Sequence, residues 1–134
     1  MKKKGFILDS YALLAYFQAE QGGAIVRDIL KKARDAEASA LLSVINLGEI
    51  YYIVARKLGT ETARELVEDI KGLPLELIDA DRARALAAAE IKAQHPLSYA
   101  DAFAAAAALE FSATIVTGDP EFKEVESQVS VLWL

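Results

Sequence analysis

The feature of this sequence that most constrains its fold is the alternation of short apolar runs with longer segments of helical periodicity. Five apolar runs predict strands, at residues 5–9, 39–43, 75–79, 113–117 and 129–134. Strands that are apolar throughout are typical of parallel sheets buried on both faces. Because parallel strands need long crossover connections, usually helices, the pattern predicts a sheet covered by helices on both sides.

The segments between these runs have the apolar periodicity of helices. Residues 25, 26, 29, 30 and 33 form one stripe, and residues 63, 66, 67 and 70 form another. Further helices are expected at about 11–19, 44–58, 81–94 and 97–110, with a short one at 120–126 that begins at a proline. The sequence therefore predicts one domain over residues 1–134. Its expected fold class is α/β, a three-layer α/β/α sandwich with a central parallel five-stranded sheet.

Composition limits the kinds of metal site that the chain can form. The sequence contains no cysteine and a single histidine. Thiolate sites and histidine-rich zinc sites are therefore excluded. A bound metal would have to be a hard ion held by oxygen ligands.

Charge and hydropathy limit the possible locations and partners. The net charge of −5 argues against a simple nucleic-acid binder, which usually presents a basic stripe. The apolar runs are too short to span a bilayer, so no membrane association is expected. Asp9 interrupts the apolar run that follows the first lysines, which argues against a signal peptide and favours a cytoplasmic protein.

Two acidic residues stand where predicted strands end. Asp9 closes the run FILD, and Asp119 closes the run TIVTGD. In open α/β sheets, ligands bind beyond the carboxyl ends of the strands, so both acids are candidates for a functional site. Each also has a purely structural explanation, because aspartate is a good N-cap for a following helix.

Glu49 is harder to explain by a structural role alone. It lies on an apolar helical stripe with Ile45 and Ile53, and Asn46 shares that face. An unpaired ionised glutamate pointing inward would cost several kcal/mol. The alternative is that the stripe lies at a boundary, where Glu49 reaches water or an arginine.

Asp101 lies in the first turn of an alanine-rich helix, LSYADAFAAAAALE. Ser98 can cap this helix, and an acid suits the positive end of the helix dipole. Asp101 is nevertheless expected at the same end of the sheet as Asp9 and Asp119. Two carboxylates about 4 Å apart repel by about 4 kcal/mol at an effective dielectric constant of about 20. Convergence of these acids therefore requires raised pKa values or a divalent cation, Mg²⁺ or Mn²⁺.

In their order and surroundings, the four acids resemble those of PIN-domain nucleases, and in particular VapC-type toxins of toxin–antitoxin modules. The stretches FILDSYALLAYF, SVINLGEIYYIVARKLG, LSYADAFAAAAALE and ATIVTGDPEF carry the resemblance, from residue 6 to residue 122. Any one of these motifs is weak evidence, but all four occur in order on the predicted elements. The implied fold is the same three-layer sandwich, reached independently above.

The resemblance implies a role for each matching residue. The acidic quartet corresponds to Asp9, Glu49, Asp101 and Asp119, with Asp9, Asp101 and Asp119 as metal ligands for Mg²⁺ or Mn²⁺. Glu49 would ligate through water or act as a base. Thr117 corresponds to a hydroxyl residue that positions a ligand or the phosphate, and Ser10 and Asn46 are possible supporting residues. One departure is EFSAT, at residues 110–114, where family members often have a glycine.

The implied activity is metal-dependent hydrolysis of RNA phosphodiesters, with a VapB-type antitoxin and a homodimer as expected partners. A PIN nuclease in RNA processing and a catalytically silent PIN-like scaffold remain alternatives. Two other acidic α/β folds fit less well. A phosphotransfer receiver needs paired acids after the first strand, and a phosphatase of the haloacid dehalogenase type needs a second aspartate at the position of Tyr11.

Overall fold

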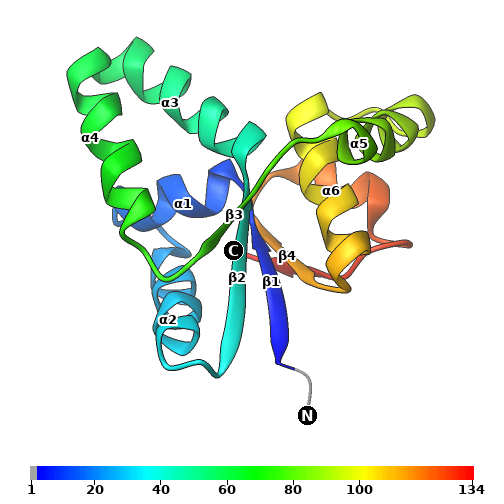
Figure 1. Ribbon diagram of the computed structural model, residues 1–134, viewed down its shortest axis with the longest axis horizontal. Coiled ribbons are helices and arrows are strands. Elements are labelled where there is room, and N and C mark those ends of the chain that lie inside the picture. Colours follow the sequence, from blue (N-terminus) through cyan, green and yellow to red (C-terminus); the bar gives the residue numbers. More distant parts are fainter. Residues whose placement is uncertain (1–2) are drawn as a thin grey trace.

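The computed structural model describes residues 3–134, which form helices on both sides of a central sheet (Figure 1). The elements in chain order are β1 (Lys4–Leu8), α1 (Ser10–Phe17), α2 (Gly23–Arg34), β2 (Ala38–Ser43), α3 (Val44–Leu58), α4 (Thr60–Lys71), β3 (Glu76–Ile78), α5 (Arg82–Gln94), α6 (Tyr99–Phe111), β4 (Thr114–Thr117), the 3-10 helix η1 (Pro120–Val125) and β5 (Val131–Trp133).

The sheet confirms the predicted fold class. Its five strands run in the order β3-β2-β1-β4-β5, and all neighbouring pairs are parallel. Helices α1 to α4 cover one face, and α5, α6 and η1 cover the other (Figure 1). The chain is thus a three-layer α/β/α sandwich.

Each face of the sheet has its own apolar core, because successive side chains of a strand point to opposite faces. In β1, Phe6 and Leu8 pack into the core beneath α1, α2 and α3, whereas Ile7 packs into the core beneath α5 and α6. All three side chains are buried. Burial on both faces explains why the strand is apolar over Phe6, Ile7 and Leu8.

The alanine-rich helix α6 is the most deeply buried helix of the sandwich. Every residue from Asp101 to Ala108 is buried. The helix contacts β1, β2 and β4, as well as α5 and α3. Small side chains allow this close approach, as the alanine content predicts, and they leave the first turn of α6 at the edge where β1 and β4 end.

Several elements differ from the predicted ones. The strands expected at 75–79 and 129–134 are shorter, Glu76–Ile78 and Val131–Trp133. They are the two edge strands, so each has hydrogen-bonding neighbours on one side only. The helix expected at 120–126 is a 3-10 helix. No helix among residues 3–134 combines the length and apolarity needed to cross a bilayer.

Candidate metal centre

The site lies where two neighbouring strands end. Asp9 directly follows β1, and Asp119 comes two residues after the end of β4. The two strands are parallel neighbours, with Leu8 beside Val116. Both acids therefore reach the same edge of the sheet, as predicted from the carboxyl ends of the strands.

Both acids also cap helices, so the structural explanation of each is correct as far as it goes. One Asp9 oxygen, Oδ1, accepts a hydrogen bond from the backbone N–H of Ala12 at 2.8 Å, which caps α1. Asp119 Oδ1 accepts one from the N–H of Glu121 at 2.9 Å, which caps η1. Capping uses one oxygen of each carboxylate, and the second oxygen is available for another contact.

Thr117 joins the two acids. Its hydroxyl donates a hydrogen bond to the second oxygen of Asp9 and accepts one from the backbone N–H of Asp119 at 2.9 Å. The Thr117 side chain is fully buried, with 0% of its surface exposed. It therefore fixes the orientation of the Asp9 carboxylate relative to the loop that carries Asp119.

Glu49 comes from α3 on the opposite side of the site, and it is half-buried. The Ser10 hydroxyl donates a hydrogen bond to Glu49 Oε1. Asn46 is fully buried one turn earlier, and its Nδ2 donates to Ser10 Oγ at 3.4 Å and to the Ala100 carbonyl at 3.5 Å. Asn46 thus connects α1, α3 and α6 behind the acids.

Asp101 occupies the first turn of α6. Its backbone N–H donates a hydrogen bond to the Ser98 hydroxyl at 3.1 Å. The predicted cap is therefore present, and it is made by Ser98 and the backbone of Asp101. The Asp101 carboxylate takes no part in this cap. Only 5% of the residue is exposed, and its Oδ2 is buried without a hydrogen-bond partner. A cap alone does not explain this carboxylate.

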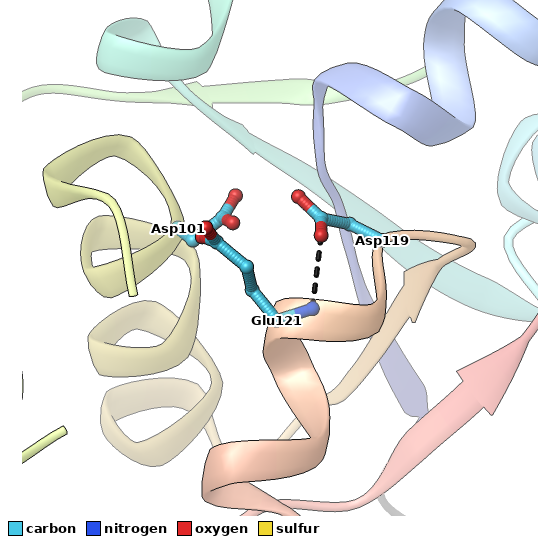
Figure 2. Close-up of side chains that lie close together, drawn as sticks. All are labelled: Asp101, Asp119 and Glu121. Atoms are coloured by element: carbon cyan, nitrogen blue, oxygen red, sulfur yellow. Dashed lines mark hydrogen bonds between the residues drawn. The ribbon is translucent and has the colours of Figure 1, made fainter. Parts of the chain in front are cut away.

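A fifth acid, Glu121, was not assigned from the sequence. Among residues 3–134, Asp101, Asp119 and Glu121 each offer a carboxylate oxygen within 4.8 Å of the other two. Figure 2 shows the Asp101 and Asp119 side chains pointing toward one another, with Glu121 reaching up beside Asp101. Glu121 Oε1 also accepts a hydrogen bond from the Ser98 N–H at 2.9 Å. The only feature of the sequence that could have indicated Glu121 is its position two residues after Asp119.

The five acids line a single cleft with a volume of about 330 Å³. We call these residues the carboxylate cluster; they are Asp9, Glu49, Asp101, Asp119 and Glu121. The structure thus brings together all four acids singled out in the sequence and adds one. The remaining lining residues are Ser10, Tyr11, Leu14, Ile53 and Ser98.

Electrostatics within the cluster favour protonation of the two most buried acids. Burial raises the pKa of Asp9 to about 7, and the neighbouring charges of Asp119 and Glu49 add to the shift. Burial also raises the pKa of Asp101 to about 9, and the neighbouring carboxylates of Glu121 and Asp119 add to the shift. The hydrogen bond from the Ser98 N–H lowers the pKa of Glu121. Without a cation, the cluster therefore holds protons at neutral pH.

The donor set suits a hard divalent cation. Carboxylate oxygens are the protein ligands preferred by Mg²⁺ and Mn²⁺. Asp101, whose buried Oδ2 has no hydrogen-bond partner, belongs to the group of three acids that each offer an oxygen within 4.8 Å of the other two. A cation there would satisfy this oxygen and offset the repulsion between the acids. Asp9 is not a member of this group of three, and both of its oxygens already accept hydrogen bonds.

Sequence comparison assigns the family of the chain. The model of the PIN domain matches residues 6–128, which include every member of the carboxylate cluster. The chain belongs to the PIN-domain family. No curated protein is similar enough in sequence to match it.

Solved structures with the same fold include several toxin–antitoxin proteins. A VapBC complex of Rickettsia felis, bound to DNA from its promoter, is 18% identical, with a TM-score of 0.75 over 97% of this chain and 98% of that chain. A DNA-bound VapBC complex of Salmonella typhimurium is 21% identical, with a TM-score of 0.74 over 98% of both chains. A sarcin-ricin loop cleaving VapC toxin of Mycobacterium tuberculosis is 14% identical, with a TM-score of 0.69 over 88% of this chain and 92% of that chain.

Proposed function

We propose that this chain is a metal-dependent endoribonuclease of the VapC type that hydrolyses RNA phosphodiesters. The observation that carries the proposal is the buried, unpartnered oxygen of Asp101 inside a cleft lined by five carboxylates. A carboxylate cluster repels a polyanion unless a cation lies between them. Nuclease chemistry on RNA is the activity that both the family and this donor set support.

Asp101, Asp119 and Glu121 would hold the cation, with Asp9 as a further ligand on the side of β1. A bound Mg²⁺ or Mn²⁺ would supply an activated water and stabilise the charge that develops on the phosphate. Glu49 lies across the cleft on α3, where it would accept a proton from a water molecule or hold that water in place. The Ser10 hydroxyl orients Glu49 for this role.

Thr117 and Asn46 act as positioning residues in this proposal. The hydrogen bonds of Thr117 hold the Asp9 carboxylate against the loop of Asp119. Asn46 anchors Ser10, and through Ser10 it anchors Glu49. Because both side chains are fully buried, their rotamers are held by packing rather than by solvent contacts.

We further propose a toxin role with a VapB-type antitoxin as partner and a homodimer as the assembled form. The fold shared with the chains of VapBC complexes supports this role. The net charge of −5 and the carboxylate cluster would attract a basic segment of such a partner. A role in RNA processing would use the same chemistry. The two roles differ in one expected result: expression of a toxin without its antitoxin arrests growth of the host cell, and expression of a processing enzyme does not.

The proposal is tested by incubating the purified protein with a labelled single-stranded RNA in Mn²⁺ or Mg²⁺. EDTA and the variant Asp101→Asn are the controls, because asparagine keeps the size of the side chain and removes its charge. Cleavage that needs the metal and falls at least about a hundredfold in the variant is expected, since the ligand charge is lost. Calorimetric titration with Mn²⁺ measures binding separately from activity.

Two results would contradict the proposal. Cleavage that persists in EDTA would remove the metal from the mechanism. Absence of both cleavage and Mn²⁺ binding in the wild type would leave the carboxylate cluster with structural roles only, and would favour the silent scaffold.

A further inference from the structure

The cleft has a second wall that the proposed hydrolysis does not use. Tyr11 and Leu14 line it from α1, and Ile53 lines it from α3. Tyr11 and Leu14 are three residues apart and so share a face of their helix, while Ile53 lies one turn after Glu49. We call Tyr11, Leu14 and Ile53 the apolar wall. It faces the same 330 Å³ cleft as the carboxylate cluster.

The ring of Tyr11 is partly exposed where it lines the cleft. It follows two buried residues, Asp9 and Ser10, yet 44% of its surface is exposed. Aromatic side chains bury a large apolar area when they are covered. An exposed ring at the rim of a cleft is therefore a candidate for contact with a ligand rather than for core packing.

The Tyr11 ring can lie against Gly118 because glycine has no side chain there. A Cβ atom added to Gly118 would lie 2.5 Å from Cζ of Tyr11 and 2.9 Å from its hydroxyl oxygen. Both distances are far too short for real contacts, so any side chain at this position would displace the ring. Gly118 does not have a positive φ, unlike Gly22 and Gly59. The reason for glycine here is therefore the close approach of Tyr11.

The composition of the cleft matches the two halves of a nucleotide. The residues that line it include five carboxylates and three apolar side chains but no lysine or arginine. The phosphate of a nucleotide would need the cation held by the carboxylates, and its base presents a flat apolar face. Stacking on aromatic side chains is how proteins commonly bind the bases of single strands. The volume of about 330 Å³ lies at the lower end of the range for small-molecule sites.

We propose that the apolar wall is the binding site for one base of the RNA substrate, the base next to the phosphodiester held at the carboxylate cluster, with the Tyr11 ring as its stacking surface. The inference rests on the proposed function and adds a base-binding site to it. A base can reach the wall only when it is unstacked and unpaired. The bound base would therefore have to come from a single-stranded segment or loop of the RNA.

The test compares RNA binding by the wild type and by Tyr11→Leu, which keeps an apolar side chain and removes the aromatic face. The probe is a short fluorescent single-stranded RNA that the wild type cleaves at one mapped site. Binding is followed by anisotropy in Ca²⁺ at low temperature, and a gel checks that the RNA stays intact. The matched control is Tyr99→Leu, because Tyr99 is also 44% exposed but does not line the cleft.

Tyr11→Leu is expected to weaken binding about tenfold, the effect of losing stacking on one base. Tyr11→Phe, which keeps the ring, and Tyr99→Leu should bind within about twofold of the wild type. Ile53→Thr changes the wall from α3 without touching Gly118, and should also weaken binding. It serves as the second variant if Tyr11→Leu fails to fold.

A probe that lacks the base beside the cleaved phosphodiester separates stacking from a structural role. Removal of this base should weaken binding by the wild type about tenfold and leave Tyr11→Leu unaffected. An equal loss in both proteins, or unchanged binding by Tyr11→Leu, would overturn the inference. If the wild type still cleaves RNA in that case, the proposed nuclease function stands without this base site. A wild type that cleaves no RNA would instead overturn the proposed function, and the base site with it.

Discussion

Single carboxylates at this site serve both as helix caps and as members of the carboxylate cluster. Asp119 caps η1 through Oδ1, while its side chain points toward Asp101 in the closest group of acids (Figure 2). Loss of an N-cap alone costs about 0.5–2 kcal/mol. Replacement of Asp119 by alanine would therefore mix a folding effect with any effect on a metal. Asparagine retains an oxygen for the cap and removes the charge, so amide variants are the informative ones.

Glu121 gives a prediction at this scale. Glu121→Gln keeps an oxygen to accept the Ser98 hydrogen bond but removes the negative charge. We expect the affinity for Mn²⁺ to fall about tenfold or more, because one charged ligand of the group is lost. Titration calorimetry measures the effect. Glu124→Gln is the matched control, since Glu124 is exposed on the same 3-10 helix and does not line the cleft. Equal affinities in both variants would show that Glu121 serves only the Ser98 contact.

At the scale of elements, the positions of the acids follow from where helices and strands begin and end. β1 and β4 end side by side and carry Asp9 and Asp119 to one edge of the sheet. Helix α6 begins beside that edge because its alanines allow it to contact both strands closely. Asp101 lies in the first turn of α6, and this turn is fixed by the Ser98 cap. The site is thus assembled from element ends, and the packing of α6 sets the spacing between Asp101 and the others.

The C-terminal end of α6 gives a second prediction. Ser112 ends the helix in the left-handed conformation, with φ of 50° and ψ of 46°. Glycine adopts this conformation without strain, and a left-handed residue with a side chain costs about 1–2 kcal/mol. Ser112→Gly should therefore raise the free energy of unfolding by about 0.5 kcal/mol, after the added flexibility of the unfolded chain is subtracted.

Urea unfolding at constant pH measures this change. Ser127→Gly is the control, because Ser127 is exposed and has no positive φ. The control should be neutral or slightly destabilised. A Ser112→Gly protein that is no more stable than Ser127→Gly would mean that the conformation of Ser112 carries no strain.

At the scale of the whole molecule, the buried acids couple folding to pH and to metal. The folded protein raises the pKa of Asp9 from 3.8 to about 7 and that of Asp101 from 3.8 to about 9. Between pH 3.8 and about pH 9, the folded chain therefore binds more protons than the unfolded chain. Stability therefore falls as the pH rises through this window. Glu121 has a lowered pKa and acts in the opposite sense, but only below its ordinary value of 4.5, so it does not oppose the decrease above about pH 5.

The third prediction is that in EDTA the free energy of unfolding decreases from about pH 5 to about pH 8, as both aspartates are forced to ionise. Mn²⁺ should reduce this decrease, because the cation stabilises the ionised carboxylates and binds the folded state. Urea unfolding at several pH values, with and without Mn²⁺, measures both effects. Asp101→Asn should show a shallower decrease in EDTA. A pH profile that is identical in wild type and variant would contradict the burial of an ionisable Asp101.

Much of this protein is determined by sequence patterns that act locally. Continuous apolar runs specify parallel strands buried on both faces, as in β1, and apolar stripes specify the helices that cover them. Capping residues fix where helices start, as Ser98 does for α6. Since parallel strands bring their carboxyl ends to one edge, Asp9 and Asp119 could be placed near each other from the sequence.

Only the tertiary structure decided which acids lie closest together and which of their oxygens remain free. Asp101, Asp119 and Glu121 form the tightest group, whereas hydrogen bonds from Ala12 and Thr117 occupy both oxygens of Asp9. The approach of Tyr11 to Gly118 is also invisible in the sequence. The physical reason is that local patterns set the direction and the ends of each element. Distances between side chains on different elements depend on how closely those elements pack.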